Sequence, residues 1–301
     1  MLSNLIYKTK LLLKYTCNPI STLLVFMGWK NKTKCKLRNN LGEFNYSQEN
    51  KEVLGCLLDS IEKIESHSID YEKEIINLNN LIKQLDNEII TINNIKYINK
   101  NISVLFEKLF EDPYDLIDFN NRYVIDIGAN IGDTALEFAN KGSKKVWAFE
   151  PLKPIFDVAV YNVNLNENFK DTVNIYNEAI SGKRRKLTLY YGGSNSTDAN
   201  TFKEAEHYYE IETMTIDDII DKYNIIPDVL KLDCEGCEYS IINNSDLSNF
   251  NDIILEYHVI FTDIHYDCII NNLKEQGFNI KLYPAFDFDV EEVGIIHAFK
   301  N

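Results

Sequence analysis

The stretch VIDIGANIGDTALEFANKGSKKVWAFEP, residues 124–151, decides the fold class of this 301-residue chain. It begins within a short apolar strand, Tyr123–Ile127, which is followed by a glycine-containing loop over residues 128–132. A helix pattern comes next, and Gly142 closes it as a C-cap. Val146–Phe149 has the composition of a second strand and leads into Glu150-Pro151. Strand, helix and strand in this order predict a parallel βαβ unit.

The same alternation continues towards the C-terminus and predicts one large α/β domain over residues 101–301. The expected helices cover Pro154–Asn166, Thr215–Tyr223 with Thr215 as N-cap, and Asp267–Gln276 with Gly277 as C-cap. The expected strands cover Val173–Ile180, Leu187–Tyr191, Val229–Leu232, Ile253–Tyr257, Phe278–Leu282 and Gly294–Phe299. This pattern predicts a doubly wound, mostly parallel sheet with helices on both faces. Ligands of such sheets bind beyond the carboxyl ends of the strands, so functional residues should follow strands directly.

Residues 1–100 have a different character and predict a mainly helical extension. Apolar residues recur at helical spacing over 51–65, and a heptad-like stripe runs from Tyr71 to Ile92. Two interpretations of this stripe remain open. A continuous helix to residue 92 would pair with a partner helix and form a homodimer. A helix that stops near Asn87, which we prefer, leaves residues 88–99 for a hairpin that turns at Asn93-Asn94.

Charge limits the classes of partner. The formal net charge of −15 and the pI of about 4.8 argue against a nucleic-acid partner. The first 40 residues are the exception, since they are locally basic. We favour a solvated face for these side chains, with contact to an anionic membrane surface as the alternative. The basic residues of this segment are Lys8, Lys10, Lys14, Lys30, Lys32, Lys34, Lys36 and Arg38.

Location is inferred from two further features. The apolar run Ile20–Trp29 is too short to cross a bilayer, and a buried helix fits it better. Six cysteines in 301 residues are too few for a disulfide scaffold. With no secretory signal evident, we expect a reducing, cytoplasmic setting.

The loop after the first strand of the domain predicts a nucleoside-binding site. A dinucleotide fingerprint would place glycines at 128, 130 and 133, but this chain has Asn130 and Asp133 at the last two positions. A carboxylate at Asp133 disfavours a pyrophosphate. S-adenosylmethionine fits instead, because it carries an amino-acid end and a cationic sulfonium. Asp126 would balance its amino group, and the N–H groups of the loop, from Gly128 to Gly132, would meet its carboxylate.

Two later strand ends complete the predicted cofactor site. Glu150 can accept hydrogen bonds from both ribose hydroxyls, although dinucleotide-binding proteins use such an acid as well. After the third strand, Asn177, Glu178 and Ala179 are placed to face the adenine. A simple turn former is an equally good interpretation of these three residues.

These residues resemble the FkbM-type methyltransferases. Four stretches carry the resemblance: residues 124–151, YNVNLN at 161–166, TIDDIIDKYNIIPDVLKLDCEGCEYSII at 215–242 and ILEYH at 254–258, with a weaker match up to Tyr114. Within the third stretch, Lys231, Asp233, Glu235, Gly236 and Glu238 form the most particular pattern. The resemblance implies a class I methyltransferase fold with an antiparallel last strand, and methyl transfer to a hydroxyl of a sugar, a glycan or a small metabolite. The chain departs from the family at Cys234 and Cys237, where small aliphatic residues are usual.

An alcohol acceptor must lose a proton, so a base is expected beside the reacting methyl group. Asp233 follows the fourth strand with Glu235 two residues on, and Glu256 and His258 end the fifth. We expect these four residues to form the catalytic cluster, with His258 or Asp233 as the base. A structural strand-end role for His258 remains the alternative, and three carboxylates with a histidine could also hold a divalent metal. We predict no metal, because nothing in the spacing demands one.

Three neighbouring features have a simpler interpretation. Glu238 is expected to cap the following helix. The chain has no second pair of closely spaced cysteines that could complete a zinc site with Cys234 and Cys237. We therefore expect small apolar packing at these two positions rather than zinc or redox chemistry. The polar loop 192–197, with Tyr190, Tyr191, Tyr208 and Tyr209 nearby, would suit acceptor recognition or be a plain connection.

The sequence therefore predicts an S-adenosylmethionine-dependent O-methyltransferase. A nitrogen acceptor stays open. The competing functions are a non-catalytic scaffold that retains the fold and an NAD-dependent oxidoreductase, against which the missing central glycine at Asn130 argues.

Overall fold

The computed structural model describes residues 2–27, 29–38, 41–47, 51–67, 71–100, 105, 113–191, 207–259, 264–285 and 290–300. The chain forms two compact units, Met1–Asp112 and Pro113–Asn301. The division lies twelve residues beyond the boundary expected after residue 100, and each unit has its own core. The polar loop 192–197 lies outside the described residues.

The N-terminal unit combines helices with two hairpins. Its elements are α1 (Leu2–Tyr15), α2 (Pro19–Phe26), β1 (Lys32–Lys36), β2 (Glu43–Ser47), α3 (Lys51–His67), α4 (Tyr71–Ile82), β3 (Ile89–Ile92) and β4 (Ile95–Ile98). The β1–β2 hairpin was not expected, because strand β1 (KTKCK) alternates short polar and basic residues around a single buried Cys35. Phe44 and Tyr46 of β2 are fully buried and anchor the hairpin.

The apolar run after residue 19 differs from the expectation. It forms helix α2, which is only partly buried, since Ile20 is 74% exposed. Trp29, which lies beyond the end of the helix, is 76% exposed. Val25 and Thr22 on the other side of α2 are buried completely. One face of α2 therefore contacts the unit and the other carries apolar side chains to the surface.

The heptad-like stripe ends as a helix followed by a hairpin. Helix α4 ends at Ile82, and strands β3 and β4 pair antiparallel with Ile92 opposite Ile95. Asn93 and Asn94 both have left-handed backbone conformations, with φ of 50° and 67°, as the tight turn requires. Asparagine tolerates this region better than most residues, which is why the turn falls there.

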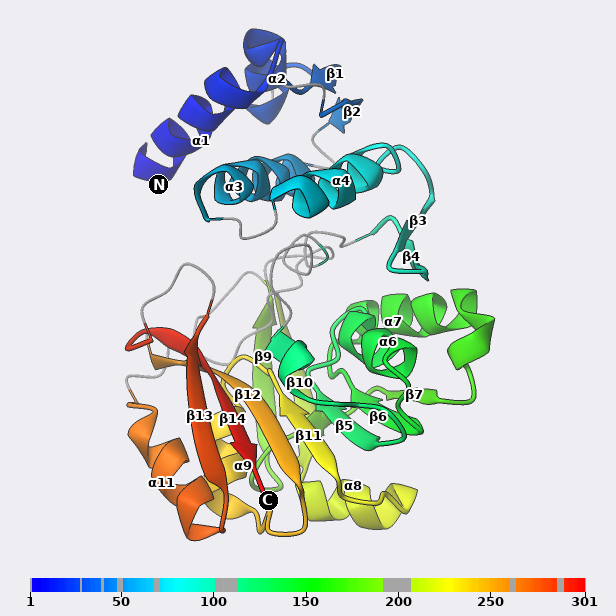
Figure 1. Cartoon of the computed structure of the whole chain (residues 1–301), viewed down its shortest axis with the longest axis vertical. Helices are drawn as coiled ribbons and strands as arrows, with labels where there is room; N and C mark the ends of the chain where they lie inside the picture. The colour runs from blue at the N-terminus through cyan, green and yellow to red at the C-terminus, as the bar shows by residue number, and fades with distance from the viewer. Residues whose placement is uncertain are drawn as a thin grey trace. The chain divides into compact units, whose positions relative to one another are not determined.

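The C-terminal unit contains a seven-stranded sheet in the order β13-β14-β12-β11-β5-β6-β7 (Figure 1). Its strands are β5 (Tyr123–Ile127), β6 (Lys145–Phe149), β7 (Val173–Tyr176), β11 (Val229–Leu232), β12 (Asp252–His258), β13 (Asn279–Pro284) and β14 (Val293–Phe299). The neighbours from β7 to β12 pair in parallel, and β14 is antiparallel to both β12 and β13. This is the class I methyltransferase topology with its antiparallel last strand, as predicted.

Helices cover this sheet on both faces. They are α6 (Asp133–Asn140), α7 (Lys153–Leu165), α8 (Ile216–Tyr223), α9 (Glu238–Asn244) and α11 (Asp267–Glu275), with short 3-10 turns at Pro113–Leu116 and Glu167–Phe169. Alternate strand residues such as Ile125, Leu230 and Ile253 pack in one core with residues of α8, α9 and α11. Asp126 points the opposite way and accepts a hydrogen bond from Thr134 of α6. Successive strand residues face opposite sides, so α6 lies on the second face.

The strand expected at Val173–Ile180 is instead two strands, which is a correction. Strand β7 ends at Tyr176, and β8 (Ala179–Ile180) leaves the main sheet to pair with β10 (His207–Met214). Strand β9 (Lys186–Tyr191) pairs antiparallel with β10 and completes a three-stranded sheet. Strand β10 was not predicted, since its alternation of charged and apolar residues only becomes a strand signal once a partner strand is present.

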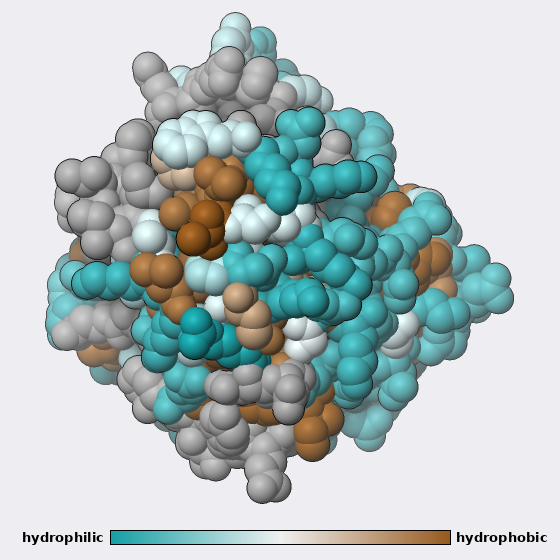
Figure 2. Space-filling model, turned by 90° about the horizontal axis from the view of Figure 1, so that it is seen from above, coloured by the Kyte–Doolittle hydropathy of each residue, from teal (hydrophilic) through white to brown (hydrophobic). Residues whose placement is uncertain are grey.

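Figure 2 shows one face on which hydrophobic side chains form separate groups between hydrophilic ones. Among the described residues, no helix is both long enough and apolar enough to cross a membrane.

Candidate functional site

The loop after β5 is shaped by two glycines with left-handed backbones. Gly128 has φ of 81°, and a Cβ there would lie 1.8 Å from the carbonyl oxygen of Asp233. Gly132 has φ of 79° and is the N-cap of α6, where a Cβ would lie 3.3 Å from Ala159 of α7. The first glycine permits contact between two strand-end loops, and the second permits close packing of two helices. Both loops therefore meet at the carboxyl edge of the sheet.

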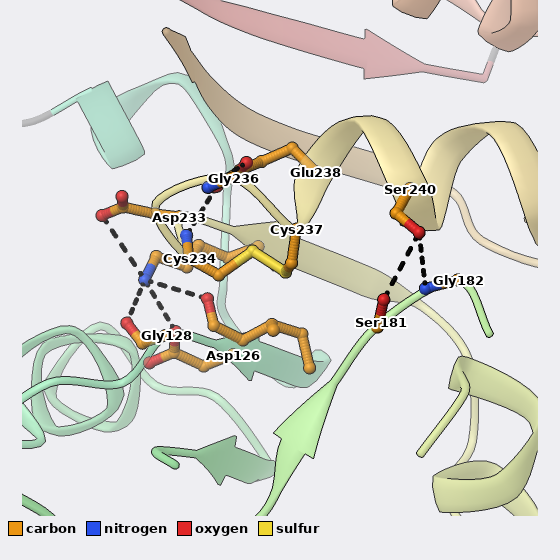
Figure 3. Close-up of a disulfide and its surroundings, with 12 residues drawn as sticks. Asp126, Gly128, Ser181, Gly182, Asp233, Cys234, Gly236, Cys237, Glu238 and Ser240 are labelled. Carbon is orange, nitrogen blue, oxygen red and sulfur yellow. Dashed lines mark hydrogen bonds and ion pairs between the residues drawn. A yellow bond between two sulfur atoms is a disulfide. The ribbon is translucent and has the colours of Figure 1, made fainter. Parts of the chain in front are cut away.

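A buried ion pair lies beneath this loop. Lys231 is 1% exposed, and its Nζ lies 3.0 Å from Asp126 Oδ1 and 2.7 Å from the Gly128 carbonyl oxygen (Figure 3). The same Nζ is 3.7 Å from Asp233 Oδ2. Burial disfavours the ammonium form, but Asp126 and Asp233 outweigh it and raise the pKa of Lys231. Lys231 thus joins the two loops electrostatically.

Asp126 is placed deeper than the sequence suggested. Its side chain is fully buried, and its Oδ2 accepts a hydrogen bond of 2.6 Å from the Thr134 hydroxyl. Burial raises its pKa, against the effect of Lys231. Both carboxylate oxygens thus contact side chains of the protein itself, so Asp126 organises the loop from below.

Lys231 was not among the residues predicted to act in the site, although it belongs to the motif around Asp233. The available signal was a lysine in the middle of the otherwise apolar strand VLKL, all four of whose residues are buried. A lysine in such a place needs a carboxylate partner. Spacing along the chain could not identify that partner, because Asp126 lies 105 positions away on the neighbouring strand.

Glu150 braces the glycine loop from the end of β6. One carboxylate oxygen accepts the N–H of Asn130 at 3.0 Å and the other accepts the N–H of Leu152 at 2.8 Å. Burial raises the pKa of Glu150 to about 7. Asn130 has a left-handed backbone with φ of 46°, and its side-chain oxygen is buried without a hydrogen-bond partner among the described residues. Asp133 is 5% exposed in the first turn of α6.

The residues after β7 face different partners. Asn177 donates hydrogen bonds of 2.9 Å to the carbonyl oxygens of both Glu150 and Pro151. Glu178 instead pairs with Lys222 and accepts a hydrogen bond of 2.6 Å from the Tyr223 hydroxyl. Ala179 is buried in β8. Of these three, Asn177 is the residue whose side chain contacts the strand end that carries Glu150.

The loop between β11 and α9 holds the next group of candidate residues. Glu235 has a left-handed backbone with φ of 53°, and Gly236 follows with φ of 118°. Glu238 is 1% exposed and accepts hydrogen bonds from the N–H groups of Cys234 at 2.6 Å and Gly236 at 2.9 Å. As the first residue of α9, it holds the preceding loop in place.

The two cysteines of this loop correct our expectation. Cys234 and Cys237 form a disulfide with their Cα atoms 5.6 Å apart, whereas small apolar packing was predicted (Figure 3). The turn through Glu235 and Gly236 brings the two side chains together, and only the folded loop reveals this. Cys17, Cys35, Cys56 and Cys268 form no disulfide, so the chain contains cysteines in both redox states.

The predicted catalytic residues form one electrostatically coupled group. His258 Nε2 lies 3.5 Å from Glu256 Oε1 at the end of β12. Although burial opposes it, this carboxylate and Glu235 raise the pKa of His258 to about 9. Burial and the charge of Asp233 raise the pKa of Glu235 to about 7. Near neutral pH the imidazole therefore carries a positive charge, and Glu235 is partly protonated.

Tyr114 also belongs to this group and was noted in the sequence only as part of a weak match. Its ring packs edge-on against Phe138, with 5.2 Å between the ring centroids. Burial raises its pKa, and so do the charges of Asp233, Asp126 and Glu256. No signal in the chain indicated that a residue before β5 would reach these carboxylates.

The arrangement suits a cationic ligand. Acidic residues around the site outnumber the cations Lys231 and His258. The acidic residues are Asp126, Asp133, Asp233, Glu235 and Glu256. Such a field favours positive charge and opposes a phosphate. Within the described ranges, no group of three or more histidine, cysteine or acidic residues has the geometry of a metal site.

A family model gives independent information. The model of the methyltransferase FkbM domain matches residues 126–280, from Asp126 in β5 to Ile280 in β13. No curated protein matches the chain.

Solved structures with a related fold include a methyltransferase FkbM from Methylobacillus flagellatus, with 17% identity over 83% of this chain and a TM-score of 0.44. The chain spans 61% of that protein, which is less than two thirds of its length. A precorrin-6y C5,15-methyltransferase from Geobacter metallireducens has 15% identity, a TM-score of 0.37 and coverage of 60% of this chain and 82% of that one. A putative tRNA (m1A22) methyltransferase from Streptococcus pneumoniae, solved with S-adenosyl-L-methionine, has 13% identity, a TM-score of 0.38 and coverage of 61% and 68%.

Proposed function

Because the chain belongs to the FkbM methyltransferase family, we propose that it transfers a methyl group from S-adenosylmethionine to a hydroxyl oxygen of a sugar, a glycan or a small metabolite. The observation that carries this proposal is the meeting of two strand-end loops. The glycine loop braced by Glu150 touches the loop of Asp233 through Gly128, at a distance no side chain would allow. A nucleoside site and a group of acids thereby share one edge of the sheet.

The residues of the glycine loop fit this cofactor. Asn130 has a buried side-chain oxygen without a partner among the described residues, and Glu150 retains lone pairs beyond its two backbone contacts. Asp133 in the first turn of α6 disfavours a pyrophosphate at the same place. The N–H groups of Gly128, Ala129, Asn130 and Gly132 already donate within the protein, so the carboxylate contact expected of them is not part of our proposal. In our proposal the glycine loop lines the amino-acid end of the cofactor, Glu150 holds its ribose, and Asn177 lies on the adenine side. When bound, the cofactor supplies a methyl group on a positively charged sulfur.

Asp233 and Glu235 are the groups we propose to accept the acceptor's proton. His258 has a pKa of about 9, so at neutral pH it is already protonated and is a poor base. Its charge instead holds Glu256, 3.5 Å away. This narrows the choice between His258 and Asp233 that the sequence left open. Alignment of the acceptor oxygen with the methyl group supplies the larger part of the acceleration, on the order of 7–11 kcal/mol.

Calorimetric titration with S-adenosylhomocysteine and with NAD tests this function. We expect the wild type to bind only the first. Glu150→Ala should bind it at least about tenfold more weakly, because the ribose loses its acceptor. Glu167→Ala, which removes a carboxylate that is 88% exposed, is the matched control. Binding of NAD would identify an oxidoreductase, and binding of neither ligand would identify a scaffold that only retains the fold.

The acceptor is tested by transfer from methyl-labelled cofactor to a panel of sugars, glycans and amines. Label on hydroxyl compounds supports the proposed oxygen acceptor. Label on amines alone would show that nitrogen is the acceptor. Asp233→Asn should abolish most of the turnover while leaving the affinity for S-adenosylhomocysteine within a few-fold, because the amide cannot take the proton. Near wild-type turnover in Asp233→Asn would remove Asp233 as the base.

A further inference from the structure

The disulfide between Cys234 and Cys237 closes the loop that presents the proposed acidic residues. Asp233 directly precedes the first cysteine (Figure 3), and Glu235 lies between the two cysteines in the chain. The disulfide therefore lies inside the candidate site, between the end of β11 and the start of α9. Both cysteines pack against the edge of the unit's hydrophobic core. A crosslink across only three positions closes a very short loop, however, so global stability does not account for it.

The backbone that the disulfide encloses is strained. Glu235 has φ of 53°, a region that a residue with a side chain avoids, and Gly236 adds a second left-handed residue. Such a conformation persists when the surroundings hold it. Two braces do so here: the Glu238 carboxylate, which accepts the N–H groups of Cys234 and Gly236, and the disulfide itself. Removal of the disulfide leaves one brace for the strained Glu235.

The solvent exposure of the two cysteines bears on exchange of the disulfide. Both cysteines are half-buried, in contrast to Cys35, which is completely buried. A disulfide that solvent can reach is attacked by thiolates, whereas one inside a core is inert.

We propose that Cys234–Cys237 is a redox modification site that controls the order of the loop carrying Asp233 and Glu235, with a neutral dithiol as its reductant. One thiolate of the reductant attacks a sulfur of the disulfide, and the cysteine on the other side leaves as a thiolate and takes up a proton. The second thiol of the reductant then resolves the mixed disulfide. Two electrons and two protons pass to the chain, which gains two thiols, and the reductant leaves as its own disulfide.

Charge around the loop selects the class of reductant. Asp233, Glu235 and Glu238 lie within one residue of a cysteine, and all are carboxylic acids. A reductant that carries net negative charge, such as glutathione, is repelled from this place, and a neutral dithiol is not. A dithiol also resolves its own mixed disulfide without a second encounter. The consequence for methyl transfer rests on the proposed function, and the change in loop order does not.

The experiment uses the full chain, oxidised in air and then treated with dithiothreitol or with glutathione at equal thiol concentration. Maleimide labelling and peptide mass mapping locate the disulfide. Hydrogen exchange of residues 233–238 reports on loop order, and calorimetry with S-adenosylhomocysteine reports on the cofactor site. The double variant Cys234→Ser, Cys237→Ser should not respond to dithiol. Cys268→Ser, which removes a half-buried free thiol, is the matched control and should respond like the wild type.

We expect dithiothreitol to expose two additional thiols, to raise exchange in residues 233–238 by about tenfold or more, and to leave exchange in β5 unchanged. Glutathione should act more slowly. Absence of the disulfide from air-oxidised protein, equal exchange in both redox states, or an equal response of the double variant would each overturn the proposal. If the loop responds but S-adenosylhomocysteine binds in neither state, the redox site stands and the proposed function fails.

Discussion

At the scale of single residues, the site depends on two positions at which the structure requires one particular residue type. Gly128 stands where a Cβ would enter the backbone of Asp233, and Lys231 is a buried cation whose charge is balanced by Asp126 and Asp233. Each connects a loop after β5 to a loop after β11. Changes at these positions should therefore disturb both loops together.

Gly128→Ala should destabilise the protein by about 3 kcal/mol and abolish binding of S-adenosylhomocysteine, because a Cβ cannot lie 1.8 Å from the Asp233 carbonyl oxygen. Gly277→Ala is the matched control: it has a similar φ of 89°, but no atom lies within 4 Å of the place a Cβ would occupy, so it should cost only about 1 kcal/mol. Urea denaturation of both variants measures the difference. Equal losses would mean that the backbone conformation, and not the contact with Asp233, makes Gly128 necessary.

Lys231→Met should destabilise the protein by about 3–5 kcal/mol, because it leaves the fully buried Asp126 without its cation. Adding Asp126→Asn should recover part of this loss, since the remaining side chain is then neutral. The coupling free energy from a double-mutant cycle in denaturant unfolding provides the measurement. Strictly additive effects would show that the two side chains do not depend on each other.

At the scale of elements, helix α2 and strand β1 combine exposed apolar and basic side chains. Residues 1–40 contain eight lysines and arginines and no acidic residue. Lys34 and Lys36 of β1 pair with Glu43 of β2, whereas Lys30 and Lys32 are near Trp29 in the chain. Ile20 and Trp29 are largely exposed, and Trp29 donates its backbone N–H to Leu24 of α2. Lysines beside exposed tryptophan and isoleucine favour the surface of an anionic bilayer. We propose that this segment makes a peripheral contact with such a surface.

Anionic phospholipid vesicles should shift the fluorescence of Trp29 to shorter wavelength, and neutral vesicles should not. The chain has two tryptophans, and Trp147 is only 7% exposed, so Trp29 dominates the response. Raising the ionic strength to about 1 M should reverse binding, because it shortens the Debye length to about 3 Å. Trp29→Phe should lose the signal but still sediment with the vesicles. Equal binding to neutral vesicles would contradict an electrostatic contact.

At the scale of the whole molecule, stability should fall as the pH rises from about 4.5 to 9. Glu150 and Glu235 have pKa values near 7 in the folded chain, so folding favours their protonated forms and the advantage is lost between their unfolded value of 4.5 and 7. The stabilisation from protonated His258 is complete below pH 6.5, the unfolded pKa of histidine, and is lost as the pH rises through its folded pKa of about 9. All three groups act in the same direction.

His258→Gln isolates one part of this dependence. Between pH 6 and pH 9.5 the wild type should lose on the order of 2–3 kcal/mol more free energy of unfolding than the variant, because only the wild type releases this proton. Denaturant unfolding at several pH values measures it, and the imidazole resonance of His258 should titrate near 9. A resonance that titrates at 6.5 would refute the pairing with Glu256.

The sequence predicts the local elements of this protein better than it predicts their tertiary contacts. The strands and helices of the seven-stranded sheet, the turn at Asn93-Asn94 and the N-cap of α8 at Thr215 follow from local patterns, because each depends on residues a few positions apart. The glycine loop, Glu150, Asp233 and His258 were found as candidates because each directly follows or ends a strand. The sequence did not predict strand β10, the position of Tyr114 near the acidic residues, or the buried ion pair of Lys231.

The sequence by itself determined the fold class, the family and the strand ends where chemistry belongs, since hydrophobic period and glycine placement are properties of short segments. Only the tertiary structure decided that Lys231 pairs with Asp126, that Cys234 is bonded to Cys237 and that His258 is charged. Those facts depend on which strands become neighbours, how a loop turns and how much water is excluded. Burial and cross-strand distance arise only when segments far apart in the chain pack together.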